Sequence, residues 1–570
     1  MINLKAMTKD ISDEYIPRSA HKARAWVKDL PITNLGETTR RLYMGLVDFN
    51  QSRISSVSRI DIADTLGDTA TLVLGNLQRH LVSRAFPLPQ KSQRIFELKQ
   101  SLLLELAGSY QLAAVDMITT ASITKRPLLK AIYSAMLYLS EVLLQHYMVY
   151  TKTRDTLWHD MHHLYLLACD NDLQNTVVLK DNDGLASIND VYKYANLLAL
   201  SNPYSLRQGE IERLEHLFHV LLPLVEIHPN ADTIETELSY IIHLNRDAHA
   251  ALVPVSDILN SPTIRVLDLS ELIKKLDCYI SALENNTKPS KYYLFKDIGI
   301  SLAKRLVFHF TRVRNRSAKR YVKNENISMV TGLSNVVTVL NNSDKLESLH
   351  NETADNPDSN DESAIANSAY ITVENLYHGI DKSQTVSDTA TPSILMQTWL
   401  VTNSSVGGYG LLWRNEEPSA ARVGAIVALR SAHDAEVEWQ IGTIRWIEFI
   451  KGRGLCVGIE FLAPYVVPIA VKKVNHMSKS VHNLPISGLM LPPIEGIRPE
   501  PELLFPPQMF RVGDELQVAF ALHEETIRLT HRDECTGSFG IFGYNVVKKE
   551  TLKLEDVIDE EDYSAIWGSL

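Results

Sequence analysis

The hydrophobic periodicity of this chain changes from a helical to a strand pattern between residues 310 and 394, and this change constrains the fold most strongly. Before it, apolar residues recur at three- and four-residue steps, as in EIERLEHLFHVLLPLVEIHP (210–229), and form one stripe along a helix. After it, short β-rich runs such as YGLLWR and GLCVGIEFLA alternate with turn residues. At 570 residues the chain also exceeds what one hydrophobic core supports. The sequence therefore predicts a multidomain α+β protein.

We expect four segments along the chain. They are an all-helical domain (1–310), a small β-barrel (311–475) with a disordered acidic insertion at about 341–392, a second small β-rich domain (476–550) and an acidic tail (551–570). The insertion contains SDKLESLHNETADNPDSNDES, which has seven acidic residues, one lysine and almost no apolar side chains. Burial there cannot offset the entropy of ordering the chain. Just before it, the β-branched NISMVTGLSNVVTVL (326–340) predicts one or two strands.

Charge and cysteine content exclude several classes of protein. The net charge of −11 argues against general binding to nucleic acid or anionic membranes, although a basic run at 303–323 holds eight Lys or Arg and no acid. The four cysteines are scattered without a CxxC pair, which fits reduced thiols in the cytoplasm. No signal peptide is visible, and the most apolar segment (128–150) contains charged residues. We therefore expect a cytoplasmic protein without a membrane span.

No motif in the chain indicates catalysis. A GxSxG elbow, a phosphate-binding lysine loop and an HExxH motif are all absent from the sequence. His159 shares a helix face with His162 or His163, but no further metal ligand accompanies them. The glycines of TGSFGIFGYN (536–545) lack the setting of a phosphate loop and favour a twisted hairpin. We expect no enzyme activity, no bound metal and no cofactor.

Two polar segments near the start of the strand region invite a functional interpretation. NSSVGG (403–408) interrupts two apolar runs, and its simplest interpretation is a hairpin turn, since Asn and Ser bond their own backbone and Gly accepts positive φ. The basic run is either a solvated helix end or linker, a nucleic-acid patch, or an arm that holds a ligand. It is short and lacks regularly interleaved stacking aromatics, which argues against nucleic acid.

The order of these segments resembles the PilZ domain, a six-stranded barrel that binds the bacterial second messenger cyclic di-GMP. RSAKR supplies an RxxxR motif, NSSVGG fits (D/N)xSxxG, and the strands VGAIVALR and IGTIRWIEFIKGRGLCVGIEFLA follow. The resemblance covers roughly residues 312–470. It implies that two arginines on an arm and three residues of the hairpin contact the ligand: Arg316, Arg320, Asn403, Ser405 and Gly408. Arg312 and Gly407 are weaker candidates. Arg312 is included because RVRNR (312–316) is also an RxxxR motif, which leaves the register of the arm open.

The side chains in these motifs suit such a ligand. Arginine pairs bidentately with phosphate or guanine and stacks on a base, while a glycine lets the backbone approach closely. We therefore expect a bacterial, cytoplasmic cyclic di-GMP receptor in which ligand orders the arginine arm and thereby acts on a helical domain that binds a protein partner. The alternatives are a scaffold whose barrel binds no ligand and, third, nucleic-acid binding through 304–323. No residue indicates whether the output is motility, pili, adhesion or biofilm.

Overall fold

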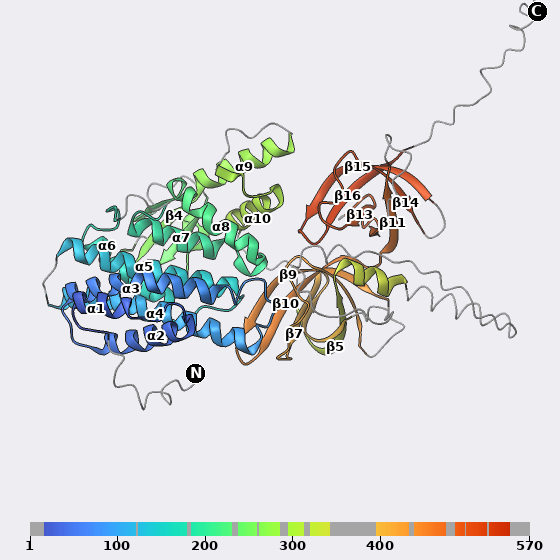
Figure 1. The fold of residues 1–570 in the computed structure, drawn as a ribbon. Helices are drawn as coiled ribbons and strands as arrows, with labels where there is room; N and C mark the ends of the chain where they lie inside the picture. The colour runs from blue at the N-terminus through green and yellow to red at the C-terminus, as the bar shows by residue number, and fades with distance from the viewer. Residues whose placement is uncertain are drawn as a thin grey trace, which may run out of the picture.

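The chain folds into a helical region and two β-barrels, as shown by a computed structural model (Figure 1). The structure describes residues 16–120, 124–178, 184–230, 237–258, 261–285, 294–312, 320–341, 395–432, 438–474, 485–495, 498–520 and 524–547. The expected acidic insertion, apart from residue 341, and the acidic tail lie outside these residues. The expected class, multidomain α+β with a helical N-terminal region and β-rich domains after it, is confirmed.

Among the described residues, ten α-helices build the first region. They are α1 (Ala20–Lys28), α2 (Leu35–Gln51), α3 (Ser56–Gln78), α4 (Gln90–Thr119), α5 (Lys125–Met148), α6 (Leu157–Asp170), α7 (Ile188–Leu200), α8 (Gln208–Leu221), α9 (Ser270–Glu284) and α10 (Ile300–Thr311). Short 3₁₀ turns occupy Pro203–Ser205, Leu222–Leu224 and Val255–Asp257. Side-chain caps begin several helices, since Ser19, Asn34, Ser55 and Ser187 each accept a backbone N–H of the first turn.

Helix α5 forms the centre of this region. It packs against α3, α4, α6, α7 and α8, and most of its side chains are buried. It is the one helix of the described residues that is long and apolar enough to cross a membrane, yet 61% of its most apolar window is buried inside the protein. The most apolar segment of the sequence, residues 128–150, thus lies largely within this buried helix.

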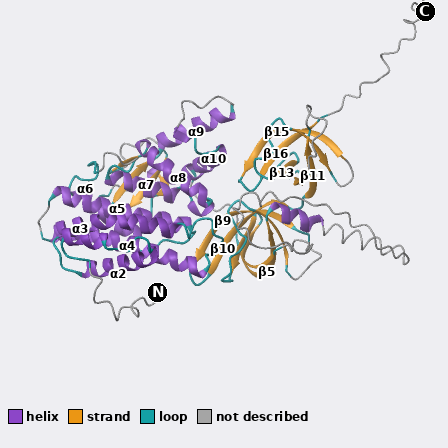
Figure 2. Cartoon of the chain, viewed as in Figure 1, coloured by secondary structure: helices purple, strands orange, loops and turns teal. Residues whose placement is uncertain are grey.

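The expectation of helices alone up to residue 310 needs one correction. Figure 2 shows strands among the helices, and they form a four-stranded sheet in the order β1-β4-β2-β3. Its strands are β1 (Glu226–His228), β2 (Leu238–His243), β3 (Ala251–Pro254) and β4 (Ile264–Asp268). Each strand has six residues or fewer, so the alternation that identifies a strand has little length in which to develop. Tyr240 and Ile242 bury against the helices, which supply the other layer of the core.

The first barrel closes in the order β10-β7-β6-β5-β8-β9, as the PilZ resemblance implies. Its strands are β5 (Tyr321–Thr331), β6 (Met396–Ser405), β7 (Gly408–Trp413), β8 (Ile426–Ser431), β9 (Gln440–Ile450) and β10 (Gly454–Ala463). Trp399, Val401 and Leu411 are buried inside it. These residues join the same apolar core as the helical region, so barrel and helices share one continuous core.

A helix at 333–341 follows β5, in a segment (326–340) for which the sequence predicts one or two strands. Only the first part of that expectation is confirmed. Leu333, Val336 and Val337 are buried on one face of the helix, at i, i+3 and i+4. They pack between the two barrels against residues such as Leu489 and Phe539 of the second one. Burial on one helical face therefore outweighs the strand preference of the β-branched side chains.

The second barrel closes in the order β11-β12-β13-β16-β15-β14. Its strands are β11 (Val467–Lys473), β12 (Ile486–Leu491), β13 (Glu502–Phe505), β14 (Glu515–Ala519), β15 (Glu524–Cys535) and β16 (Gly540–Val546). The expected boundary at 475/476 therefore comes too late, because β11 pairs with β12 and β14 and belongs to this barrel. The glycine-rich segment 536–545 spans the turn of the β15–β16 hairpin and most of β16, as expected.

Several contacts join the helical region to the barrels. Backbone atoms connect Tyr150 to β9, since the Phe449 N–H donates to the Tyr150 carbonyl at 2.7 Å. Ser419 donates through both its N–H and its hydroxyl to the Phe86 carbonyl, at 2.7 Å each. Lys451, in the β9–β10 turn, forms an ion pair with Glu97 at 3.2 Å. The first barrel is thus held to the helices by backbone as well as side-chain contacts.

One arginine contacts all three parts of the molecule. Arg207, just before α8, donates from Nε to the Val423 carbonyl of the first barrel at 2.9 Å. Its Nη2 donates to the Ser538 hydroxyl of the second barrel, also at 2.9 Å. A second link joins the barrels directly, because Arg445 on β9 pairs with Glu534 on β15.

Candidate functional site on the first barrel

The β6–β7 hairpin carries the motif predicted to bind ligand. Ser405 and Gly408 are paired, so the turn between them has two residues, Val406 and Gly407. Val406 is 97% exposed, and the Gly407 carbonyl accepts the Phe461 N–H of β10 at 2.9 Å. The simple interpretation of this segment as a hairpin turn is therefore correct, and the turn lies at the barrel surface.

Gly408 is fixed by the barrel itself. A β-carbon there would lie 1.9 Å from the Ile459 carbonyl oxygen, because β7 and β10 run close together at this point. At Gly407 a β-carbon would meet nothing within 4 Å. The need for glycine at 408 is thus explained by strand packing and gives no evidence for close approach of a ligand.

Asn403 and Ser405 are half-buried and weakly held. The Asn403 amide donates to the Thr402 hydroxyl at 3.2 Å, and the Ser405 hydroxyl donates to the Gly408 carbonyl at 3.3 Å. The Thr402 hydroxyl in turn donates to the Gly410 carbonyl at 2.9 Å. Because the hairpin's own bonds are long, both motif side chains retain capacity to bond another molecule.

Strand pairing brings the arm to this hairpin. Arg320 directly precedes β5, where Tyr321 lies opposite Ser404 and Val322 opposite Asn403. Continuing this antiparallel register places Arg320 beside Ser405. Arg320 is exposed and has no side-chain partner among the described residues. The structure therefore puts one predicted arm residue next to the predicted hairpin.

The other arm candidates are less well placed. Arg316 lies outside the described residues, so the structure does not test it. Arg312 caps α10 and stacks its guanidinium over the Phe308 ring at 4.8 Å. The choice between the Arg316/Arg320 and Arg312/Arg316 registers stays open.

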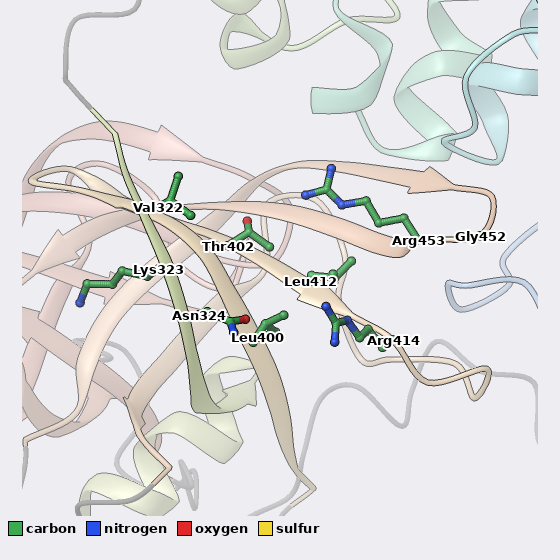
Figure 3. A pocket seen from close by; sticks show the side chains of 9 residues that line it. All are labelled: Val322, Lys323, Asn324, Leu400, Thr402, Leu412, Arg414, Gly452 and Arg453. Atoms are coloured by element: carbon green, nitrogen blue, oxygen red, sulfur yellow. The ribbon is translucent and has the colours of Figure 1, made fainter.

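A cavity of about 650 Å³ lies on the surface of the first barrel. Val322 and Thr402, which directly follow Tyr321 and precede Asn403 in the sequence, are among the residues that line it. Strands β5, β6 and β7 and the β9–β10 turn form its walls (Figure 3). The side chains that line it are those of Val322, Lys323, Asn324, Leu400, Thr402, Leu412, Arg414 and Arg453, together with Gly452. Its size falls within the range of small-ligand sites.

Two arginines of this cavity were not identified from the sequence. Arg414 follows β7 and Arg453 lies in the β9–β10 turn, and Figure 3 shows both side chains beside Leu412. Both are exposed, and neither guanidinium has a hydrogen bond or ion pair among the described residues. The sequence shows each as a basic residue at the end of an apolar strand. Only the pairing of β7 with β10 brings them to one cavity.

Lys323 differs from these arginines. It points away from them in Figure 3 and pairs with Glu325 at 2.9 Å. That hydrogen bond raises the pKa of Lys323 above its ordinary value. The cavity therefore offers two guanidinium groups that have no partner among the described residues, an arrangement that favours an anion with more than one charge.

Two other clusters of titratable groups have structural explanations. His162 is fully buried, and its ring nitrogens bond the Tyr192 hydroxyl at 2.6 Å and the Ala248 carbonyl at 3.0 Å. Glu502, His531 and Asp533 of the second barrel lie within 4.8 Å of one another. Arg498 already pairs with Glu502 at 2.8 Å, and we assign this cluster no metal.

Comparisons with known proteins agree with this geometry. Three family models match successive stretches: the N-terminal domain of the cyclic-di-GMP receptor FimW (21–232), its middle PilZ domain (240–468) and its C-terminal β-barrel domain (469–547). The chain belongs to the PilZ-domain family of cyclic di-GMP receptors. The third match begins near β11, which supports the corrected boundary of the second barrel.

A relative from Pseudomonas aeruginosa extends the match over the whole chain. It is described as the cyclic-di-GMP receptor FimW and is 24% identical over 598 aligned positions. The alignment covers 96% of this chain and 95% of the relative. No solved structure matches the chain.

Proposed function

We propose that this chain binds cyclic di-GMP on the outer face of its first barrel, between Arg320, the 403–408 hairpin and the adjoining cavity. The observation that carries the proposal is the β5–β6 register, which sets Tyr321 opposite Ser404 and so brings the end of the arm to the hairpin. Two motifs about 80 residues apart in the sequence thus meet at one place on a barrel of the matching family.

The ligand's chemistry matches the side chains gathered there. Cyclic di-GMP carries two phosphodiester charges and two guanines. Arg320, Arg414 and Arg453 supply three exposed guanidinium groups, which pair with phosphate or with the guanine edge. Asn403 and Ser405 supply polar groups whose own bonds are long. The two charges of the ligand would therefore meet a surface of opposite charge.

The path from α10 to β5 supports a mechanism in which the ligand orders the arm. α10 is tied to the helical region by the ion pair of Arg305 with Glu210 and by the Tyr240 hydroxyl, which donates to the His309 carbonyl at 3.1 Å. The arm continues α10 and ends at Arg320, beside the hairpin. A ligand that binds the arm against the barrel would favour one arrangement of α10 relative to the barrel, because it binds that arrangement more tightly.

The receptor that we propose is cytoplasmic and has no enzymatic activity. Its output would pass through a protein partner bound to the helical region. This part of the proposal depends on the family and on the exposed positions of Arg312 and Arg320 on either side of the arm, and it names no process. The ligand is a signal in this scheme and is released unchanged.

Isothermal titration of the full-length chain with cyclic di-GMP tests the proposal. Arg320→Ala should weaken binding roughly ten- to a hundred-fold, because a charge-assisted bond contributes about 1.5–3 kcal/mol. Arg453→Ala should weaken it about tenfold for the same reason. The melting temperature without ligand should not change, since both side chains are exposed.

Arg312→Ala is the matched control, because it removes the same charge at the far end of the arm. It should cost much less affinity if Arg316 and Arg320 form the arm motif. Equal losses for Arg312→Ala and Arg320→Ala would contradict that register. A wild-type protein that gives no heat at high micromolar cyclic di-GMP would leave the scaffold interpretation in its place.

A further inference from the structure

A second cavity, of about 530 Å³, lies inside the helical region and has no part in the proposed function. Helices α3, α4, α5, α7 and α8 surround it. One lysine and three glutamates line it, Lys99 against Glu141, Glu212 and Glu215. With His219 neutral, the formal charge of the lining is +1 − 3 = −2. The cavity therefore has an excess of negative charge inside a largely apolar bundle.

Lys99 does not balance this charge. Its side chain is almost fully buried, with 2% exposure, and its Nζ donates to the Gln78 amide oxygen at 2.8 Å. The Glu141 carboxylate lies 3.5 Å from the same atom. Burial lowers the pKa of Lys99 below its ordinary value. The one cation of the cavity is thus already held by Gln78 and Glu141.

Two glutamates and one amide oxygen are left without a donor. Glu212 and Glu215 have no hydrogen bond or ion pair among the described residues. Gln145 is 4% exposed and donates from Nε2 to Glu141 at 2.9 Å, while its Oε1 is buried without a partner. A buried amide oxygen such as that of Gln145 is costly unless a donor reaches it, whereas the two glutamates are half-buried.

The electrostatic state of Glu215 reflects the same imbalance. Burial, together with the nearby charges of Glu141 and Glu212, raises the pKa of Glu215 to about 7. Lys99 opposes this shift but is outweighed. The apolar part of the wall includes Leu74, Leu103, Leu137, Tyr138, Leu144 and Met148. The cavity thus combines hydrogen-bond acceptors with apolar side chains in one lining.

We propose that this cavity binds an organic cation, an ammonium or guanidinium on an apolar stem, with Glu215 and Gln145 as acceptors. The cation would supply the donors that the unpaired acceptors lack, and its stem would cover the leucine side chains. A free small amine and a lysine or arginine side chain of a partner protein share this chemistry. The proposal is independent of cyclic di-GMP, because no residue of the first barrel takes part in it.

Titration of the full-length chain at pH 8 with two probes tests the proposal and separates the two sources. Agmatine represents a free amine, and the blocked peptide acetyl-Leu-Arg-Leu-amide represents a partner's side chain. At least one should bind saturably. Glu215→Gln should weaken that binding about tenfold, since one charge partner is lost. Lys99→Met should strengthen it, because it removes the competing cation from the cavity.

Glu271→Gln on α9 is the matched control, as it removes the same charge from an exposed position that does not line the cavity. Its affinity should equal that of the wild type. Binding should also release more protons at pH 6.5 than at pH 8, because the cation favours the ionised form of Glu215. The charged or titratable groups that line the cavity with Glu215 are Glu141, Lys99, Glu212, His219, Tyr138 and Tyr194.

Failure of both probes to bind would overturn the proposal. Equal losses for Glu215→Gln and Glu271→Gln would also overturn it, since a general charge effect would then explain the binding. Agmatine binding indicates a small-molecule site, and binding of the peptide alone indicates a partner's side chain.

Discussion

At Gly408 the backbone of β7 passes so close to β10 that a side chain has no room. A β-carbon would lie 1.9 Å from the Ile459 carbonyl oxygen, and backbone atoms cannot rotate away as a flexible side chain can. The glycine of the motif thus maintains the strand pairing that also carries Tyr409 and Gly410. A position in a predicted ligand-binding motif can therefore be required by the fold alone.

Gly408→Ala should destabilise the protein strongly, by more than about 2 kcal/mol, because β7 and β10 must separate to admit the methyl group. Gly407→Ala, one residue away, should change stability little, since a β-carbon there meets nothing within 4 Å. Thermal melts of both variants without ligand measure the difference. Equal melting temperatures for the two variants would show that β7 and β10 leave more room at residue 408 than the 1.9 Å distance indicates.

The sequence pointed to some residues of the candidate site and not to others, for a physical reason. Arg320, Asn403 and Ser405 were predicted because their motifs are local in sequence, and the β5–β6 register brings Arg320 beside the hairpin. Arg414 and Arg453 were missed because only the pairing of β7 with β10 brings them together. Long-range pairing of strands is not visible in local patterns.

Among the elements, the helix at 333–341 shows how burial decides between two local preferences. Its valines favour a strand when each is considered alone, but Leu333, Val336 and Val337 recur at helical spacing. The same reasoning applies to β1–β4, whose strands were too short to reveal alternation. The sequence thus predicted long helices and longer strands well, and short elements at domain junctions poorly.

Val336→Ala should cost roughly 2 kcal/mol, because two methyl groups leave a fully buried site between the barrels. Thr338→Ala on the exposed side of the same helix is the control and should be close to neutral. Denaturant unfolding followed by tryptophan fluorescence measures both. A similar loss of unfolding free energy in both variants would show that the helix does not pack into the apolar core between the two barrels.

His162 on α6 makes the stability of the helical region depend on pH. Burial lowers its pKa to about 4, whereas an unfolded histidine titrates near 6.5. Between these values the unfolded chain takes up a proton that the folded chain does not. The contribution of this group is therefore present above pH 6.5 and decreases as the pH falls toward 4.

At pH 5 this linkage should cost about 2 kcal/mol relative to pH 7. His162→Gln cannot be protonated, so its melting temperature should fall less between pH 7 and pH 5 than that of the wild type. Burial also lowers the pKa of His146 to about 4. This histidine remains in both proteins, so part of the fall in melting temperature between pH 7 and pH 5 should remain as well. An identical fall in melting temperature for the two proteins would contradict the assignment of this pH dependence to His162.

At the scale of the whole molecule, Arg207 connects the three parts through one partly buried guanidinium. Desolvation lowers its pKa from the ordinary value, although Glu210 opposes this. A β-carbon at Gly537 would lie 2.2 Å from its Nη1, so the second barrel approaches it as closely as glycine allows. The helical region, which carries this side chain, thus contacts both barrels through it.

Arg207→Ala should divide the unfolding of the molecule into separate steps. The Val423 carbonyl loses its donor, which costs about 1–3 kcal/mol, and the bond to Ser538 is lost as well. Differential scanning calorimetry should show a second transition or a clearly broader one. Arg213→Ala, at an exposed position of α8, is the control and should leave the profile unchanged. One sharp transition for Arg207→Ala would mean that other contacts suffice for cooperativity.

The direct backbone bond between Tyr150 and Phe449 has a consequence for how proteins of this kind change over generations. Recombination that exchanged only the first barrel between two distant relatives would have to preserve the Tyr150–Phe449 bond, the Phe86–Ser419 bonds and the Arg207 contacts at once. Each mismatch would expose part of the core that the helices and the barrel share. The three segments should therefore be inherited as one unit, and gene fusions that separate them should be rare.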